Sequence, residues 1–156
     1  MHWPKGGLNN GRDVNTITSY VDVVPTLIDY CKVQAPKGVK FDGMNIRPLI
    51  DGTVQKWPDR ILVTDSQRVR DPIKWRKSSV MTDQWRLVNG KELYDINADP
   101  GQKNNIADAN PKVVARLTKF YDAWWDEIVP TFGKPTAIYL GAEATLENHM
   151  TLTCHD

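Results

Sequence analysis

The stretch Trp85-Arg86-Leu87-Val88-Asn89-Gly90-Lys91-Glu92-Leu93-Tyr94 carries the strongest structural signal in the chain. Two short β-rich segments flank Asn89-Gly90, and this dipeptide favours a type I′ hairpin turn because both of its residues must adopt positive φ. Two further β-rich segments precede the hairpin, at residues 60–64 and 78–82. We therefore expect an antiparallel meander of about four strands over residues 60–95.

A long amphipathic helix is predicted after the sheet, over residues 111–129. Asn110 as N-cap and Pro111 at the first helical position form a well-matched start, while Pro130 and Gly133 end the segment. Its apolar residues recur at spacings of three and four: Val113, Val114, Leu117, Phe120, Tyr121, Trp124, Trp125 and Ile128. A helix with such a face must cover another element, and the sheet is the obvious one. The expected class is α+β.

The first part of the chain reads differently. A helix is predicted over Asp22–Lys32, with Asp22 as N-cap, and its apolar residues are Val24, Leu27, Ile28 and Cys31. We expect Cys31 to be a small buried hydrophobe. A second short helical turn is predicted around Arg47–Asp51, and the alternating tail Asn148–Asp156 reads as a last strand.

Composition limits the function. The 156 residues carry 20 Lys and Arg against 19 Asp and Glu, a net charge of +1, which argues against a protein built to hold a nucleic-acid duplex. We expect no membrane span, since no apolar run approaches the roughly 20 residues that a span needs. The start at Met1 resembles no signal peptide, so no targeting signal is expected in this chain.

Few residues suit catalysis or metal binding. His occurs only at positions 2, 149 and 155, which argues against a Ser-His-Asp or Cys-His arrangement. His149, Cys154, His155 and Asp156 are metal ligands by type, but their spacing fits no zinc pattern and an exposed strand face is the simpler interpretation. We therefore expect no catalytic and no metal-ligating residue in this chain.

The segment between the first two predicted strands is basic. Gln67, Arg68, Arg70, Lys74, Arg76 and Lys77 lie within eleven residues. Arginine forks there could bind sulfate, phosphate or carboxylate groups, although a solvated loop with local ion pairs would have the same composition. Trp75, one of six Trp, could stack on a sugar or cover the edge of the core.

Several motifs, in order along the chain, resemble the later part of sulfatases of the formylglycine-dependent, bacterial arylsulfatase type. They are Trp3-Pro4, Asp22-Val23-Val24-Pro25-Thr26-Leu27, Phe41-Asp42-Gly43, Trp57-Pro58-Asp59-Arg60, Glu92-Leu93-Tyr94-Asp95, Asp99-Pro100-Gly101 and Tyr121-Asp122-Ala123-Trp124-Trp125. The resemblance implies a hydrolase of aryl or carbohydrate sulfate esters. It also implies a calcium ion and a formylglycine nucleophile in the intact enzyme, which would be periplasmic or secreted.

This chain lacks the C/S-x-P-x-R motif from which the family makes formylglycine. The resemblance therefore implies a C-terminal fragment that is inactive alone and has no cofactor of its own. Residues 1–55 would be a helical remnant of the α/β sulfatase domain, and residues 56–156 the C-terminal subdomain. The helix of the remnant could then use its uncovered apolar face to form a homo-oligomer.

The resemblance also strengthens the functional interpretation of the basic segment, because the family's C-terminal subdomain packs beside the substrate cleft. Gln67, Arg68, Arg70 and Trp75 are accordingly predicted to recognise a sulfated small molecule or glycan in the intact enzyme. A stand-alone carbohydrate- or polyanion-binding module is the alternative. Single-stranded nucleic-acid binding is a weaker third option, disfavoured by the small net charge.

Overall fold

The computed structural model describes residues 13–54, 56–67, 69 and 71–132. The chain divides into two compact units, residues 1–60 and residues 61–156. The division between the units lies five residues after the boundary at residue 55 that the sequence suggested. The assignment of the first part to the α/β sulfatase domain and of the second to the C-terminal subdomain stays a prediction.

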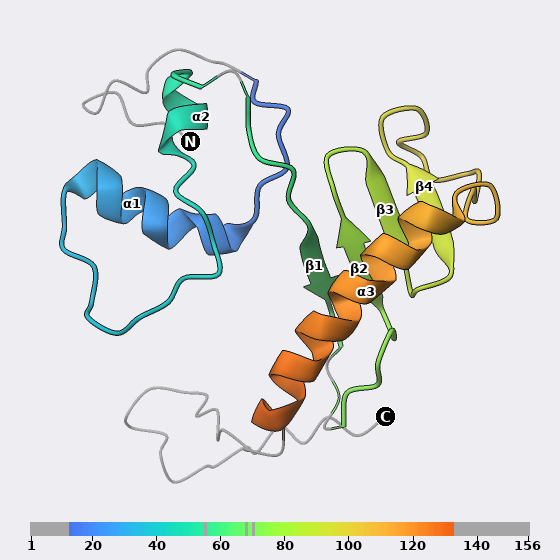
Figure 1. Ribbon diagram of the computed structural model, residues 1–156. Coiled ribbons are helices and arrows are strands. Elements are labelled where there is room, and N and C mark those ends of the chain that lie inside the picture. The colour runs from blue at the N-terminus through green and yellow to red at the C-terminus, as the bar shows by residue number, and fades with distance from the viewer. Residues whose placement is uncertain (1–12, 55, 68, 70, 133–156) are drawn as a thin grey trace, which may run out of the picture. The chain divides into compact units, whose positions relative to one another are not determined.

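The second unit contains the predicted antiparallel meander. Strands β1 (Leu62–Asp65), β2 (Ser78–Met81), β3 (Trp85–Val88) and β4 (Glu92–Asp95) pair in the order β1-β2-β3-β4 (Figure 1). The turn between β3 and β4 has positive φ at both of its central residues, 49° at Asn89 and 69° at Gly90. The Asn-Gly signal therefore predicted the hairpin correctly, because the turn uses the backbone conformation that this dipeptide tolerates.

Helix α3 (Pro111–Ile128) covers one face of this sheet (Figure 1). The strand register aligns four apolar residues in one row across the sheet: Val63, Val80, Leu87 and Leu93. Leu117, Tyr121 and Trp125 lie four residues apart on α3 and are buried with this row. The predicted α+β class and the helix–sheet core are thus confirmed.

The start of α3 differs in detail from its prediction. Asn110 occupies the N-cap position, but its side-chain amide donates to the carbonyl oxygen of Ile106 at 3.0 Å and does not cap the helix. The backbone carbonyl of Asn110 instead accepts from the amides of Val113 and Val114, at 3.1 and 3.2 Å.

The first unit contains α1 (Val23–Cys31), which follows a 3₁₀ turn at Tyr20–Asp22, and α2 (Arg47–Asp51). Its centre is polar. Asp22 is completely buried and its carboxylate binds the guanidinium of Arg60 through two contacts, Nη1 to Oδ2 at 2.7 Å and Nη2 to Oδ1 at 2.9 Å. The amides of Ser19 and Met44 donate to the same carboxylate, each at 2.8 Å. Asp22 therefore joins three segments of this unit and does not act as a side-chain cap of α1.

The residues before α2 pack closely against the start of α1. The hydroxyl of Thr26, which is 1% exposed, donates to the carbonyl of Asp22 and accepts from the amide of Ile46 at 3.0 Å. A Cβ at Gly43 would overlap the backbone carbonyl of Val21, so only glycine fits there. The buried side of α1 is consequently its polar side.

The expected burial of Cys31 is wrong, whereas the apolar face of α1 is largely uncovered, as the sequence analysis expected. Val23, Val24 and Leu27 are 43%, 52% and 41% exposed, and Cys31 at the end of the helix is exposed as well. The reason is that hydrogen bonds to Asp22 and Thr26 fix the opposite side of the helix against residues 43–46. Helical periodicity located the apolar stripe correctly, but it does not reveal what covers the stripe.

The stability of the first unit should depend on pH through Asp22. Burial raises the pKa of this carboxyl, but Arg60 and the amides of Met44 and Ser19 outweigh burial and hold the pKa below its ordinary value of 3.8. A lowered folded pKa adds stability that is present above 3.8 and lost as the pH falls through the folded pKa. We expect the free energy of unfolding to decline below pH 3.8 and Asp22→Asn to remove part of that decline, measured by urea unfolding across pH.

At neutral pH, Asp22→Asn should destabilise this unit by about 3–5 kcal/mol, because it leaves the guanidinium of Arg60 buried without a counter-charge. Asp42→Asn, which changes an exposed carboxylate in the same unit, is the matched control. Equal stability of the two variants would contradict the central role given to Asp22.

Gly90→Ala should destabilise the second unit. The substitution strains a residue at φ +69°, which costs about 1–3 kcal/mol, and the new Cβ would lie 2.9 Å from Cδ2 of Trp75. Gly38→Ala separates the two effects, since Gly38 has φ +79° but no atom within 4 Å of an added Cβ. We expect the larger loss of unfolding free energy for Gly90→Ala, and equal losses would show that the Trp75 contact is unimportant.

Candidate functional site

The basic segment forms the connection between β1 and β2, and we name residues 66–77 the basic loop. Its two ends are held together, because the neighbouring residues Asp65 and Ser78 pair in the β1–β2 ladder and the amide of Ser66 donates to the carbonyl of Lys77 at 3.3 Å. Both ends of the loop therefore lie side by side at the same end of the sheet. The predicted substrate-recognition residues Gln67, Arg68, Arg70 and Trp75 all belong to it.

Gln67 bridges the loop with its side chain. Its Nε2 donates to the carbonyl of Ile73 and its Oε1 accepts from the amide of Ile73, both at 2.9 Å. One side-chain amide therefore forms hydrogen bonds with both the backbone N–H and the backbone C=O of Ile73. Gln67 Nε2 also lies 3.1 Å from Oδ2 and 3.2 Å from Oδ1 of Asp65, the last residue of β1.

Trp75 belongs to the sheet–helix core. Its ring stacks on Tyr121 with centroids 3.8 Å apart, and it lies against Gly90 of the hairpin turn. The backbone of Trp75 has φ 65°, and its amide donates to the hydroxyl of Tyr121 at 3.1 Å. The side chain is half-buried, so Tyr121 takes one ring face that a sugar could otherwise use.

The phenol of Tyr121 joins these groups. It accepts from the amide of Trp75 and donates to Oδ2 of Asp65 at 3.3 Å, and the residue is completely buried. Burial raises the pKa of this phenol, which keeps the hydroxyl protonated and able to donate at neutral pH. Sequence reasoning assigned Tyr121 to the apolar stripe and to one motif of the sulfatase resemblance, and gave its hydroxyl no role. The one available signal was general: a buried tyrosine hydroxyl needs a polar partner.

The cations of the basic loop are not equivalent. Lys74 Nζ lies 2.8 Å from Oδ1 of Asp122 on α3, and this carboxylate raises the pKa of Lys74. Arg76 and Lys77 are exposed. Arg68 and Arg70 lie outside the described residues, as do His149, Cys154, His155 and Asp156.

The described residues do not suit a metal ion. They contain no cluster of three or more His, Cys, Asp or Glu side chains that could hold one. The carboxylates of Asp29 and Asp51 are both bound by Arg47, at 3.3 and 3.0 Å. The hydroxyl of Tyr30 donates to Asp51 at 2.6 Å, and burial together with this bond raises the pKa of Tyr30 to about 12. These carboxylates are therefore committed to a structural network, and the calcium that the sequence resemblance implied finds no fitting ligands here.

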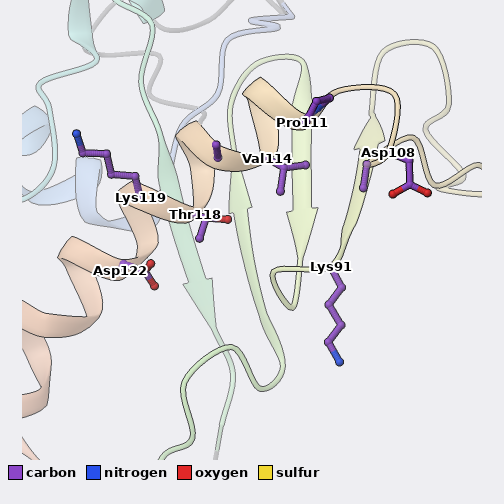
Figure 2. Close-up of a pocket in the computed structure, with 9 residues that line it drawn as sticks. Lys91, Asp108, Pro111, Val114, Thr118, Lys119 and Asp122 are labelled. Atoms are coloured by element: carbon purple, nitrogen blue, oxygen red, sulfur yellow. The ribbon is translucent and has the colours of Figure 1, made fainter.

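An open groove of about 760 Å³ lies along α3, beside the hairpin turn that carries Lys91 (Figure 2). Its charged residues are Lys91, Asp108, Lys119 and Asp122. Figure 2 shows the side chains of Lys91 and Lys119 extending in opposite directions. Ligand sites in proteins usually converge a few polar groups on one point, so this groove is a weaker candidate than the basic loop.

Within the described residues, no helix is long and apolar enough to cross a membrane.

Known proteins with similar sequences and structures are sulfatases. Arylsulfatase K of Gallus gallus is 25% identical over 125 residues, which span 72% of this chain and 23% of that protein. The Δ4,5-hexuronate-2-O-sulfatase of Bacteroides thetaiotaomicron is 24% identical over 134 residues, which span 83% of this chain and 27% of that protein. The chain thus spans about a quarter of the length of the curated relatives it matches.

Solved structures support the same fold. One, determined in complex with its substrate D-glucosamine-2-N,6-O-disulfate, superposes with a TM-score of 0.50 at 20% identity over 77% of this chain and 27% of its own. A second, a sulfatase from a glycosaminoglycan locus of Bacteroides thetaiotaomicron, gives the same TM-score and identity over 66% of this chain and 24% of its own.

The family model described as "N-sulphoglucosamine sulphohydrolase, C-terminal" matches residues 1–122, well over half of the chain. This match agrees with the observed meander and covering helix, and with the partial coverage of longer sulfatases. The chain therefore belongs to the family of sulfatase C-terminal domains.

Proposed function

We propose that this chain is the C-terminal part of a sulfatase that hydrolyses aryl or carbohydrate sulfate esters. Membership of the family supports the reaction class, and the match to a quarter of the relatives' length supports a part of a larger enzyme. In this proposal the chain contributes no catalytic residue. The calcium ion and the formylglycine nucleophile belong to another part of the enzyme, which would act in the periplasm or outside the cell.

The substrate side of the chain is the basic loop. We propose that Arg68 and Arg70 contact the sulfate groups of the substrate, because guanidinium forks bind such oxyanions through paired hydrogen bonds.

The observation that supports this proposal is that two residues of the loop have fixed partners. Gln67 hydrogen-bonds Ile73 across the loop and Asp65 at the end of β1, while Trp75 stacks on Tyr121 in the core. Their part in recognition is therefore to support the loop. A sulfated glucosamine is the substrate named for one structural neighbour, which favours a sulfated sugar.

The exposed side of α1 is the proposed contact with another protein surface. Tyr20 is 86% exposed, and with Val23, Val24 and Leu27 it forms an apolar strip along the start of the helix. Such a strip on a helix gains stability when covered. The catalytic part of the enzyme would cover it in the intact protein, and a second copy would cover it when this chain is alone.

The reaction is tested by assaying the purified chain with a chromogenic aryl sulfate, with and without calcium. We expect no turnover above buffer, because the nucleophile motif is absent from the sequence. Calcium-dependent turnover would refute the assignment of the catalytic residues to another part of the enzyme.

The substrate side is tested by titrating the chain with a heparin oligosaccharide and with the same oligosaccharide after chemical desulfation. We expect binding only to the sulfated form, weakened at least about tenfold by Arg68→Ala with Arg70→Ala, as loss of a charged hydrogen bond would produce. Lys103→Ala with Lys112→Ala removes the same charge from exposed positions outside the loop. Equal weakening by the two pairs would indicate attraction by net charge alone.

A further inference from the structure

We propose that the face of the sheet opposite α3 is a contact surface for a second copy of this chain. One arginine and one glutamate on that face would each pair with the opposite residue of the other copy. This contact is separate from the exposed strip on α1, and it does not depend on the substrate proposed above.

The strand register determines which side chains belong to this face. Because side chains alternate between the two faces of a sheet, the neighbours of the apolar row under α3 point to the opposite side. They form two further rows, each of which crosses all four strands. The first row is Leu62, Met81, Arg86 and Tyr94, and the second is Thr64, Ser79, Val88 and Glu92. We name these eight residues the open face.

No helix of the same unit covers the open face. In the part of the chain that the structure describes, α3 is the one α-helix after residue 60, and it packs on the other face of the sheet (Figure 1). Thr64 and Glu92 are exposed, while Met81, Arg86 and Tyr94 are half-buried. A sheet face that remains in water usually carries polar side chains. Here aliphatic and aromatic side chains lie among the polar ones, so a covering surface would bury apolar area.

Arg86 lacks a partner on its own chain. Its Nε is buried and has no hydrogen-bond acceptor among the described residues, and none of their ion pairs includes its guanidinium. The guanidinium groups of Arg47 and Arg60, in contrast, are bound by carboxylates. A buried donor without an acceptor costs free energy, so a carboxylate from outside the chain would supply what this guanidinium lacks.

Glu92 supplies the complementary charge. Its carboxylate accepts from the hydroxyl of Tyr94 at 3.0 Å and keeps lone pairs for further donors. The six other residues of the open face, apart from Arg86 and Glu92, are uncharged. A twofold axis that is parallel to the sheet and passes between these two residues places Arg86 of each copy opposite Glu92 of the other. The open face is therefore electrostatically complementary to itself, as a twofold dimer requires.

The dimer should be weak, because eight side chains on each copy make a smaller contact than the roughly 20–30 residues of a stable interface. We expect a dissociation constant between about 10 µM and about 1 mM. Sedimentation velocity of the 156-residue chain over this concentration range should show a monomer that converts to a dimer.

Charge reversal tests the contact. Arg86→Glu and Glu92→Arg each place like charges opposite one another in the dimer, and each should weaken association at least about tenfold. A chain that carries both changes restores opposite charges and should dimerise about as well as the original chain. Lys112→Glu makes the same change in net charge as Arg86→Glu at an exposed position of α3, and it should leave association unchanged. Circular dichroism checks that each variant is folded, and Glu92→Arg changes an exposed side chain.

Methyl NMR locates the contact on the sheet. The methyl signal of Met81, on the open face, should shift as the concentration rises. The methyl signals of Leu117, which is completely buried beneath α3, should not shift. In Glu92→Arg the signal of Met81 should become independent of concentration. A dimer that forms without any shift at Met81 would overturn the proposal.

Three other results would overturn it. The chain could stay monomeric up to about 1 mM. The double charge reversal could fail to restore association. Finally, Leu27→Glu could abolish a dimer that both charge reversals leave intact, which would show that the copies meet through the exposed strip on α1. None of these results bears on the proposed sulfatase function, which the sulfate-ester and oligosaccharide experiments test separately.

Discussion

Tyr121 brings one completely buried phenol into contact with three parts of the C-terminal unit. Its ring packs with the apolar row of the sheet and stacks on Trp75, while its hydroxyl joins the amide of Trp75 to the carboxylate of Asp65. An unsatisfied hydroxyl at this depth would cost about 1–3 kcal/mol. Its two partners are Asp65 at the end of β1 and Trp75 in the basic loop. The fold of the sheet and the geometry of the basic loop therefore depend on the same side chain.

The N-terminal unit is held together in the opposite way. Its centre is an ion pair, Asp22 with Arg60, surrounded by backbone donors, and Leu49 is the one buried apolar side chain among its described residues. Three apolar side chains of α1 remain on the surface, those of Val23, Val24 and Leu27. Exposed apolar strips of this kind are commonly covered by another protein surface. The exposed strip on α1 therefore agrees with the finding that this chain matches only a part of longer sulfatases.

Much of the fold could be read from local signals. The Asn89-Gly90 turn, the proline at position 111 and the spacing of Leu117, Tyr121 and Trp125 each reflect a short-range rule of backbone conformation or periodicity. The same rules placed Asp22 correctly at the N-cap position of α1 but did not reveal its buried contacts, and they failed at Cys31. Burial on α1 depends on a segment some twenty residues away, which periodicity does not detect. The basic loop was visible as a run of cations, yet the bracing by Gln67 was not, since a glutamine pairing with the backbone of Ile73 leaves no sequence pattern.

The sequence by itself determined the helix–sheet architecture, the position of the basic loop and, through its ordered motifs, the resemblance to sulfatases. These are properties of neighbouring residues and of their types. Only the tertiary structure decided which side of α1 is buried, that Lys74 is paired with Asp122, and that Asp65, Gln67 and Trp75 meet at Tyr121. The physical reason is that hydrogen bonds and ion pairs between distant segments depend on how the chain closes on itself, and residue spacing along the sequence carries no record of that closure.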